Sequence, residues 1–68
     1  MRTNLKMFRV KVGLSQEDMS KRIGCSRATY SAIERGARTG NLSFWNKLSM
    51  AFALPSNEMH ELFKTDDE

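Results

Sequence analysis

Residues 13–36 read GLSQEDMSKRIGCSRATYSAIERG, and this stretch decides the fold of the 68-residue chain. Ser15 and Ser26 each stand where a side-chain oxygen caps a helix, and a glycine suited to the left-handed end of a helix closes each half. The pattern predicts helices over about 16–23 and 27–35, joined by only three residues. Since so short a turn does not allow an antiparallel return, the two helices should cross steeply.

Three further amphipathic helices are predicted outside this stretch. They span about residues 4–12, about 42–53, and a short segment that begins at Pro55, the residue that ends the preceding helix. The apolar residues that mark them are Leu5, Phe8 and Val12, then Leu42, Trp45, Leu48 and Phe52, and then Met59, Leu62 and Phe63. No segment alternates between apolar and polar residues as a strand does, so we expect an all-α domain of five helices.

The length of the chain predicts one domain with one small core, because short chains bury a small fraction of their surface. We place the domain over residues 1–68, its core at about 4–63 and an acidic tail at 64–68. The tail residues that we expect to fray into solvent are Asp66, Asp67 and Glu68.

The composition excludes several classes of protein. No apolar run reaches the length that spans a bilayer, and the start of the chain lacks the apolar core of a secretory signal, which favours a cytoplasmic protein. Cys25 is the only cysteine and His60 the only histidine, so we expect no internal disulfide, no closed zinc site and no cofactor. Without a nucleophile beside a base or a glycine-rich phosphate loop, the chain is not expected to be an enzyme.

Positive charge is concentrated in the first part of the chain. Residues 1–40 hold nine Lys or Arg and three Asp or Glu, whereas residues 41–68 hold two and five, so the two parts carry +6 and −3. This asymmetry predicts that the N-terminal part meets a polyanion, and a steeply crossing helix pair is the geometry that enters the major groove of DNA. A merely solvated basic surface is the alternative.

The spacing of these features is similar to that of the XRE family, the helix-turn-helix of phage Cro proteins and repressors. The residues that carry the resemblance are Gly13-Leu14-Ser15-Gln16-Glu17-Asp18-Met19, Ile23-Gly24-Cys25-Ser26-Arg27 and Ile33-Glu34-Arg35-Gly36. It extends over about residues 5–63. The resemblance implies a lambda-repressor-like domain whose second and third helices read double-stranded DNA, in a small transcriptional regulator such as a repressor or a Cro-like switch.

The helix over 27–35 is the expected recognition helix. With Tyr30 and Ile33 pointing into the core, its opposite face meets the bases. The base-reading candidates on that face are Arg27, Ala28, Ser31 and Ala32, of which all but the serine match base-reading positions of the family. Arg27 should donate to guanine O6 and N7, while alanine methyl groups favour thymine methyl groups. A phosphate contact, or no contact, is the alternative for Arg27.

Other residues are expected to hold the DNA backbone without reading sequence. Gln16 resembles the family glutamine that binds a phosphate together with nearby amide groups at a helix start. The loop after the recognition helix and the start of the fourth helix should flank the same groove. The backbone candidates are Arg9, Gln16, Ser26, Arg35, Arg38 and Asn41. An ordinary surface glutamine and solvated loop charges are the alternatives.

Arg9 and Glu34 match a family pair in which an arginine of the first helix meets a glutamate of the recognition helix. Such pairing neutralises a carboxylate that would otherwise repel phosphate, and it leaves the arginine turned toward the DNA backbone. An exposed, unpaired Glu34 is the alternative.

One recognition helix specifies few base pairs, so we expect a homodimer on a two-fold symmetric site. The fourth and fifth helices are expected on the far side from the helix over 16–23, free to meet a second copy. The apolar residues expected at the dimer interface are Phe44, Met50, Leu62 and Phe63. Isolated surface hydrophobes are the alternative. A protein-interaction adaptor or an antitoxin on the same fold is the alternative function.

Overall fold

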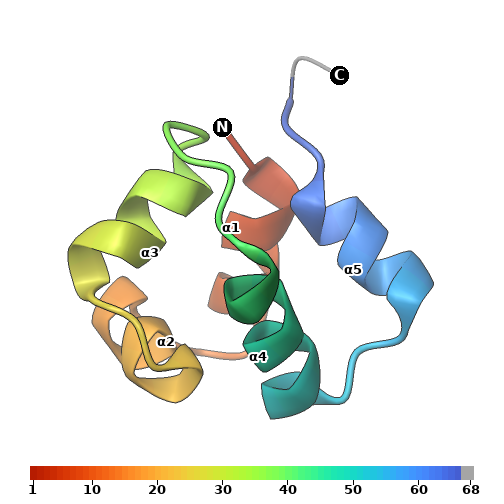
Figure 1. The fold of residues 1–68 in the computed structure, drawn as a ribbon, viewed down its shortest axis with the longest axis horizontal. Coiled ribbons are helices and arrows are strands. Elements are labelled where there is room, and N and C mark those ends of the chain that lie inside the picture. Colours follow the sequence, from red (N-terminus) through yellow and green to blue (C-terminus); the bar gives the residue numbers. More distant parts are fainter. Residues whose placement is uncertain (67–68) are drawn as a thin grey trace.

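Five helices make up residues 1–66, the part of the chain that the computed structural model describes (Figure 1). They are α1 (Thr3–Lys11), α2 (Gln16–Ile23), α3 (Arg27–Glu34), α4 (Leu42–Phe52) and α5 (Ser56–Phe63). The predicted all-α fold is confirmed, and the predicted bounds of the first four helices agree with the observed ones to within one residue. No helix in these residues is long and apolar enough to cross a membrane.

Side-chain caps fix where the middle three helices begin. Ser15, Ser26 and Asn41 cap α2, α3 and α4, and each side-chain oxygen accepts a hydrogen bond from the backbone amide three residues ahead, at 3.0, 3.1 and 2.8 Å. Asp18 accepts a bond from the Ser15 amide in return, which completes a capping box. Each cap satisfies a donor that helix geometry leaves open and contributes about 1 kcal/mol.

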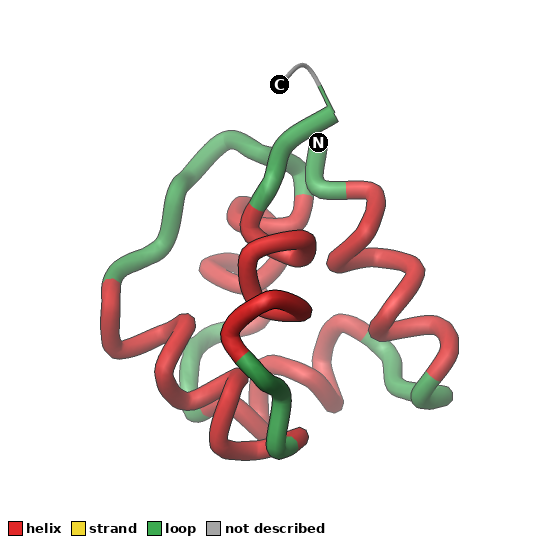
Figure 2. The backbone as a smooth tube through the Cα atoms, turned by 90° about the vertical axis from the view of Figure 1, so that its right-hand side faces the viewer, coloured by secondary structure: helices red, strands yellow, loops and turns green. Residues whose placement is uncertain are grey.

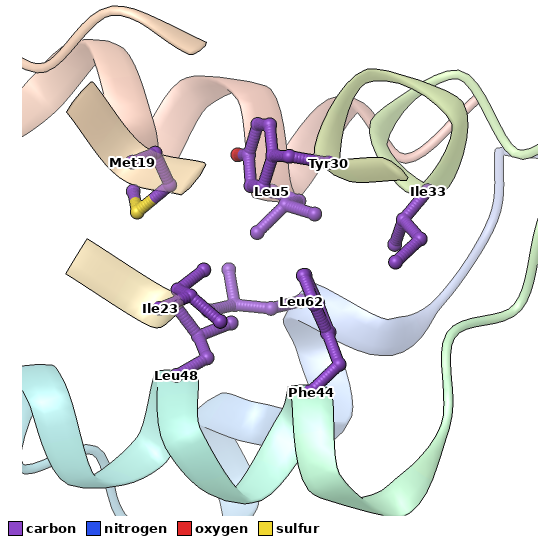
Figure 3. Close-up of a cluster of buried hydrophobic side chains, with 8 residues drawn as sticks. All are labelled: Leu5, Met19, Ile23, Tyr30, Ile33, Phe44, Leu48 and Leu62. Atoms are coloured by element: carbon purple, nitrogen blue, oxygen red, sulfur yellow. The ribbon is translucent and has the colours of Figure 1, made fainter. Parts of the chain in front are cut away.

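The core forms where the five helices meet (Figure 3). Its buried apolar residues are Leu5, Met19, Ile23, Tyr30, Ile33, Phe44, Leu48 and Leu62. Every helix contributes at least one of them. Tyr30 and Ile33 point into this core as predicted, which turns the opposite face of α3 toward solvent.

The α4 helix turns a different face to the core from the one predicted. Leu42, which the apolar pattern places in the core, is 76% exposed, whereas Phe44, which it places at the dimer interface, is only 5% exposed. At about 100° per residue, Leu42 lies about 120° around the helix from the buried Leu48, while Phe44 lies only about 40° away. The assignment of Phe44 to a dimer interface is therefore wrong.

Three further expectations are corrected by the packing of the helices. Leu62 belongs to the core because α5 packs against α1, so its assignment to a dimer interface is wrong. The α4 helix packs against α2, so the expectation that it lies on the far side from α2 is wrong. Val12 is the C-cap of α1 and is exposed, so it does not extend the apolar face of that helix. Met50 and Phe63 are exposed, as a surface role requires.

The two ends of the described chain lie side by side at one end of the molecule (Figure 2). The Asp66 amide donates to the carbonyl of Met1, and its carboxylate accepts bonds from the Thr3 amide at 3.1 Å and the Thr3 hydroxyl at 2.6 Å. The expectation that Asp66 frays is thus wrong, because its carboxylate caps α1, whose first turn holds no acidic residue. These bonds lower the pKa of Asp66. Asp67 and Glu68 lie outside the described residues.

Arg2 is buried, although it precedes the core boundary expected from the sequence. Its backbone amide donates to the carbonyl of Glu34 at 2.8 Å. Its guanidinium donates to three further carbonyls, those of Phe63, Ile33 and Arg38, at 2.8, 2.7 and 2.9 Å. This one side chain therefore ties α5, α3 and the loop after α3 together.

Candidate nucleic-acid interface

The α2 and α3 helices form a closed helix-turn-helix unit. Gly24 ends α2 in the left-handed conformation, with a φ of 89°, which glycine adopts without steric cost. The amides of Gly24 and Cys25 both donate to the carbonyl of Ser20, at 2.8 and 2.9 Å, and Ser26 then caps α3. Because hydrogen bonds hold every residue of the turn, α3 leaves α2 in a fixed direction. The two helices lie on the left of Figure 1.

Opposite the core, α3 presents a face of short side chains and one arginine. Arg27 and Ala28 are exposed, and Ser31 and Ala32 are half-buried. Side chains this short let the helix backbone approach a partner surface closely, and Arg27 supplies the paired donors that guanine O6 and N7 accept. The four candidate base-reading residues thus share one accessible face of α3; their contact with bases stays a prediction.

An ionic cluster lies at the other end of α3. Arg9 holds Glu34 at two points, with Nε 2.9 Å from Oε2 and Nη2 3.3 Å from Oε1. Gln16 Nε2 donates to the same Oε1 at 3.1 Å, and Arg9 Nη1 donates to the carbonyl of Leu14 at 2.9 Å. Glu34 is only 2% exposed. The structure therefore contains the predicted pair of Arg9 and Glu34, and Glu34 is not an exposed surface carboxylate.

The groups in this cluster stabilise one another electrostatically. Burial works against ionisation of Glu34, but hydrogen bonds from Arg9 and Gln16, together with the nearby Tyr30 hydroxyl, outweigh it and lower the pKa of Glu34. The hydrogen bond to Glu34 raises the pKa of Arg9. Burial, and then the neighbouring Glu34 carboxylate, raises the pKa of Tyr30. The negative charge of α3 is therefore neutralised inside the protein and does not oppose an approaching phosphate.

The cluster also links Gln16 to α3, which sequence reasoning did not predict. Gln16 is half-buried in the first turn of α2 and uses one amide hydrogen on Glu34, so a second remains for a phosphate. Arg9 keeps 13% of its side chain exposed and has hydrogens on both Nη atoms beyond those it uses. Phosphate contacts from these two residues stay predictions.

Replacing Gln16 by Ala should weaken binding to every DNA sequence alike, by about tenfold or more, because a hydrogen bond to a charged group contributes about 1.5–3 kcal/mol. Fluorescence anisotropy on a preferred duplex and a scrambled duplex measures both losses. Lys21→Ala is the matched control, since Lys21 is exposed on α2 and lies about 140° around the helix from Gln16. A loss confined to the preferred duplex would argue against a phosphate contact.

A groove of about 460 Å³ lies between the turn of the helix-turn-helix unit and the loop that leads into α4. The predicted backbone residues Arg38 and Asn41 line it on the side of the loop, and Gly24 and Cys25 line it on the side of the turn. The side-chain oxygens of Asn41 and Ser26 accept hydrogen bonds as helix caps, and the Ser26 hydroxyl donates to the Thr29 hydroxyl, so the side-chain donor that remains for a phosphate is the amide of Asn41. Arg35 and Arg38 are exposed on the loop directly after α3.

Lys47 is a residue of this groove that sequence reasoning missed. It is exposed, and its Nζ lies 3.8 Å from the position that a Cβ on Gly24 would take. Its spacing could have identified it, because Lys47 follows Ser43 by four residues and therefore lies on the same face of α4 as the start of that helix. Among residues 1–66, no three His, Cys, Asp or Glu side chains lie together as metal ligands.

A capped helix pair joined by a tight turn, whose second helix exposes an arginine among short side chains, defines a helix-turn-helix domain. Residues 5–59 match the helix-turn-helix family model. The chain therefore belongs to the XRE-type helix-turn-helix family, whose members are DNA-binding transcriptional regulators.

Relatives of the chain are named as HTH-type transcriptional regulators. The full chain is 34% identical to an uncharacterized HTH-type transcriptional regulator of Archaeoglobus fulgidus, of which it covers 93%. It is 32% identical to one of Methanocaldococcus jannaschii and 31% identical to YgzD of Bacillus subtilis, and covers 98% of each. No solved structure matches the chain.

Proposed function

We propose that this chain is a small transcriptional regulator of the repressor or Cro-like type that binds a two-fold symmetric operator as a homodimer. The observation that carries the proposal is the outer face of α3. Arg27 and Ala28 are exposed there, on a helix whose own carboxylate, Glu34, is buried and paired. Paired donors and methyl groups on the outer face are the groups that recognise guanine and thymine in the major groove.

In the proposed complex α3 enters the major groove. Arg27 donates two hydrogen bonds to guanine O6 and N7, which is the commonest specific contact of this kind. The methyl groups of Ala28 and Ala32 meet thymine methyl groups, and the Ser31 hydroxyl bonds to a neighbouring base edge. Each protomer then reads a few adjacent base pairs.

The residues around α3 hold the two DNA strands. Gln16 and Arg9 lie together beside Glu34 and face one stretch of backbone. Arg35 and Arg38 follow α3 and face another, together with the amides at the start of α4. Such contacts set the register of the protein on the duplex and carry no sequence information of their own.

A second copy of the chain supplies the second recognition helix. In this class of protein the half-sites lie about one helical turn apart, on the order of 34 Å. Of the candidate interface residues, Met50 and Phe63 support such a contact because both are exposed. Leu42, 76% exposed, lies within about 80° of Met50 around α4 and extends the same apolar surface.

Selection of bound duplexes from a random pool tests the proposal directly. We expect the enriched sequences to be palindromic, because the two-fold axis of a dimer imposes its symmetry on the site. Titration of the protein onto the selected duplex should reach two chains per duplex, as measured by analytical ultracentrifugation. One chain per duplex on a site without symmetry would remove the dimer from the proposal. Failure to enrich any sequence would favour a protein-interaction adaptor.

A further inference from the structure

The C-terminal end of α3 is completed by a residue from the start of the chain. A helix end leaves carbonyl oxygens without donors, and α3 has no basic residue in its last turn. Arg2 supplies a donor and a cation at this end, since its backbone amide donates to the carbonyl of Glu34 and its Nη1 donates to the carbonyl of Ile33, which also accepts from the Gly36 amide. A buried cation thus lies at the negative end of the helix.

The same guanidinium holds the loop that follows α3. Arg2 Nη1 also donates to the carbonyl of Arg38, so a single nitrogen bridges the two ends of the segment 33–38. From the other side, the amides of Ala37 and Arg38 fold back onto the carbonyl of Ala32, at 2.9 and 3.2 Å. The backbone of this segment is therefore held both by its own helix and by Arg2.

The guanidinium is in turn held rigidly. It lies 5.5 Å from the centre of the Trp45 ring and 5.3 Å from that of the Phe63 ring, and its Nε donates to the carbonyl of Phe63. The Trp45 ring also donates to the carbonyl of Thr39 at 2.9 Å, so it contacts the loop directly. A planar cation with donors in a fork suits this position, and the single ammonium of a lysine does not reproduce it.

We propose that Arg2 is a positioning residue for DNA binding, which fixes the loop of residues 35–41 so that the exposed Arg35 and Arg38 face the DNA backbone. The inference rests on the proposed function, because it requires these two arginines to bind phosphate. A loop held by its carbonyl groups presents both side chains without the entropic cost of ordering the backbone on binding. Arg2 is itself buried and acts only through the loop.

The test compares Arg2→Met, Arg2→Lys and the control Asp66→Ala. The control removes the α1 cap at the same end of the molecule without touching the loop. At a temperature where circular dichroism shows each variant folded, Arg2→Met should bind the selected duplex about tenfold more weakly. The slope of its affinity against salt concentration, on logarithmic scales, should fall by the amount that corresponds to the loss of about one to two phosphate contacts. Amide exchange of Ala37 and Arg38 should quicken selectively. Arg2→Lys should recover little, and Asp66→Ala should bind as the unchanged protein does.

Equal affinity and an equal salt slope for folded Arg2→Met and the control would overturn the proposal, and so would faster amide exchange spread evenly over all helices. If Arg2→Met does not fold, the same comparison with Arg2→Lys decides. If the unchanged protein binds no DNA, the proposed function fails, and the role of Arg2 in DNA binding fails with it. Amide exchange at Ala37 and Arg38 still shows whether Arg2 holds the loop.

Discussion

Replacing Arg9 by Met should lower the free energy of unfolding by about 3–5 kcal/mol at neutral pH, because it leaves Glu34 charged and buried without its partner. Met keeps much of the apolar stem of arginine, so lost packing is the smaller part of the effect. A chain of this length rarely has a core that supplies more than about 3–5 kcal/mol. The variant should therefore be largely unfolded at room temperature, as measured by urea titration followed by circular dichroism.

A second substitution separates the lost charge pair from lost packing. In the double variant Arg9→Met with Glu34→Gln the buried group is neutral, so most of the stability should return. The bond from Gln16 remains possible because the side-chain oxygen of a glutamine still accepts it. An Arg9→Met variant with the urea midpoint of the unchanged protein would show that this pair does not stabilise the fold.

The pH dependence of stability should change sign when Arg9 is removed. In the unchanged protein the pKa of Glu34 is lowered, so its contribution is present above the unfolded value of about 4.3 and is lost as the pH falls through the lower folded value. Removing Arg9 takes away two of the effects that lower the pKa of Glu34, while burial, the largest single effect, still raises it, so we expect this pKa to rise above that of the unfolded chain. Arg9→Met should then lose stability as the pH rises through this window, in urea titrations at pH values spanning about 3–7.

The helices of this chain could be predicted because their ends are encoded locally. Ser15 and Ser26 bond to amides three residues ahead, and Gly24 takes the left-handed conformation, so each signal acts within one turn of chain. The buried face of α4 could not be read in the same way. Apolar residues occur around much of that helix, and apolar residues spaced three apart drift around its axis. The predicted apolar stripe therefore included the exposed Leu42 and left out the buried Phe44.

The contacts that complete the helix ends could not be predicted from local sequence. Asp66 caps α1 and Arg2 closes α3 from the far ends of the chain, and only the packing of α1 against α5 and α3 brings them there. A carboxylate near the C-terminus and an arginine near the N-terminus resemble ordinary solvated charges. The pairing of Arg9 with Glu34 was expected only because the sequence resembles a family that has such a pair, and the bond from Gln16 to Glu34 was not expected.

Replacing Arg27 by Ala should weaken binding to the selected operator by about 1–3 kcal/mol in each half-site, and so by about 2–6 kcal/mol in a dimer that uses both. The variant should fold as the unchanged protein does, since Arg27 is exposed at the first turn of α3. Because two bonds to one guanine are lost, discrimination should relax at one base pair of each half-site and stay intact elsewhere. Anisotropy measured on a panel of duplexes, each with one base pair changed, reports both effects.

Arg35→Ala is the control that separates base reading by Arg27 from a phosphate contact. Arg35 is exposed on the loop after α3 and is expected to bind backbone, so its removal should weaken every duplex of the panel by a similar factor. A phosphate contact from Arg27 would give that same uniform pattern. Loss of preference at one symmetric pair of positions in Arg27→Ala, with uniform loss in Arg35→Ala, is the result that base reading requires. Uniform loss in both variants would place Arg27 on the backbone and leave the bases to the short side chains of α3.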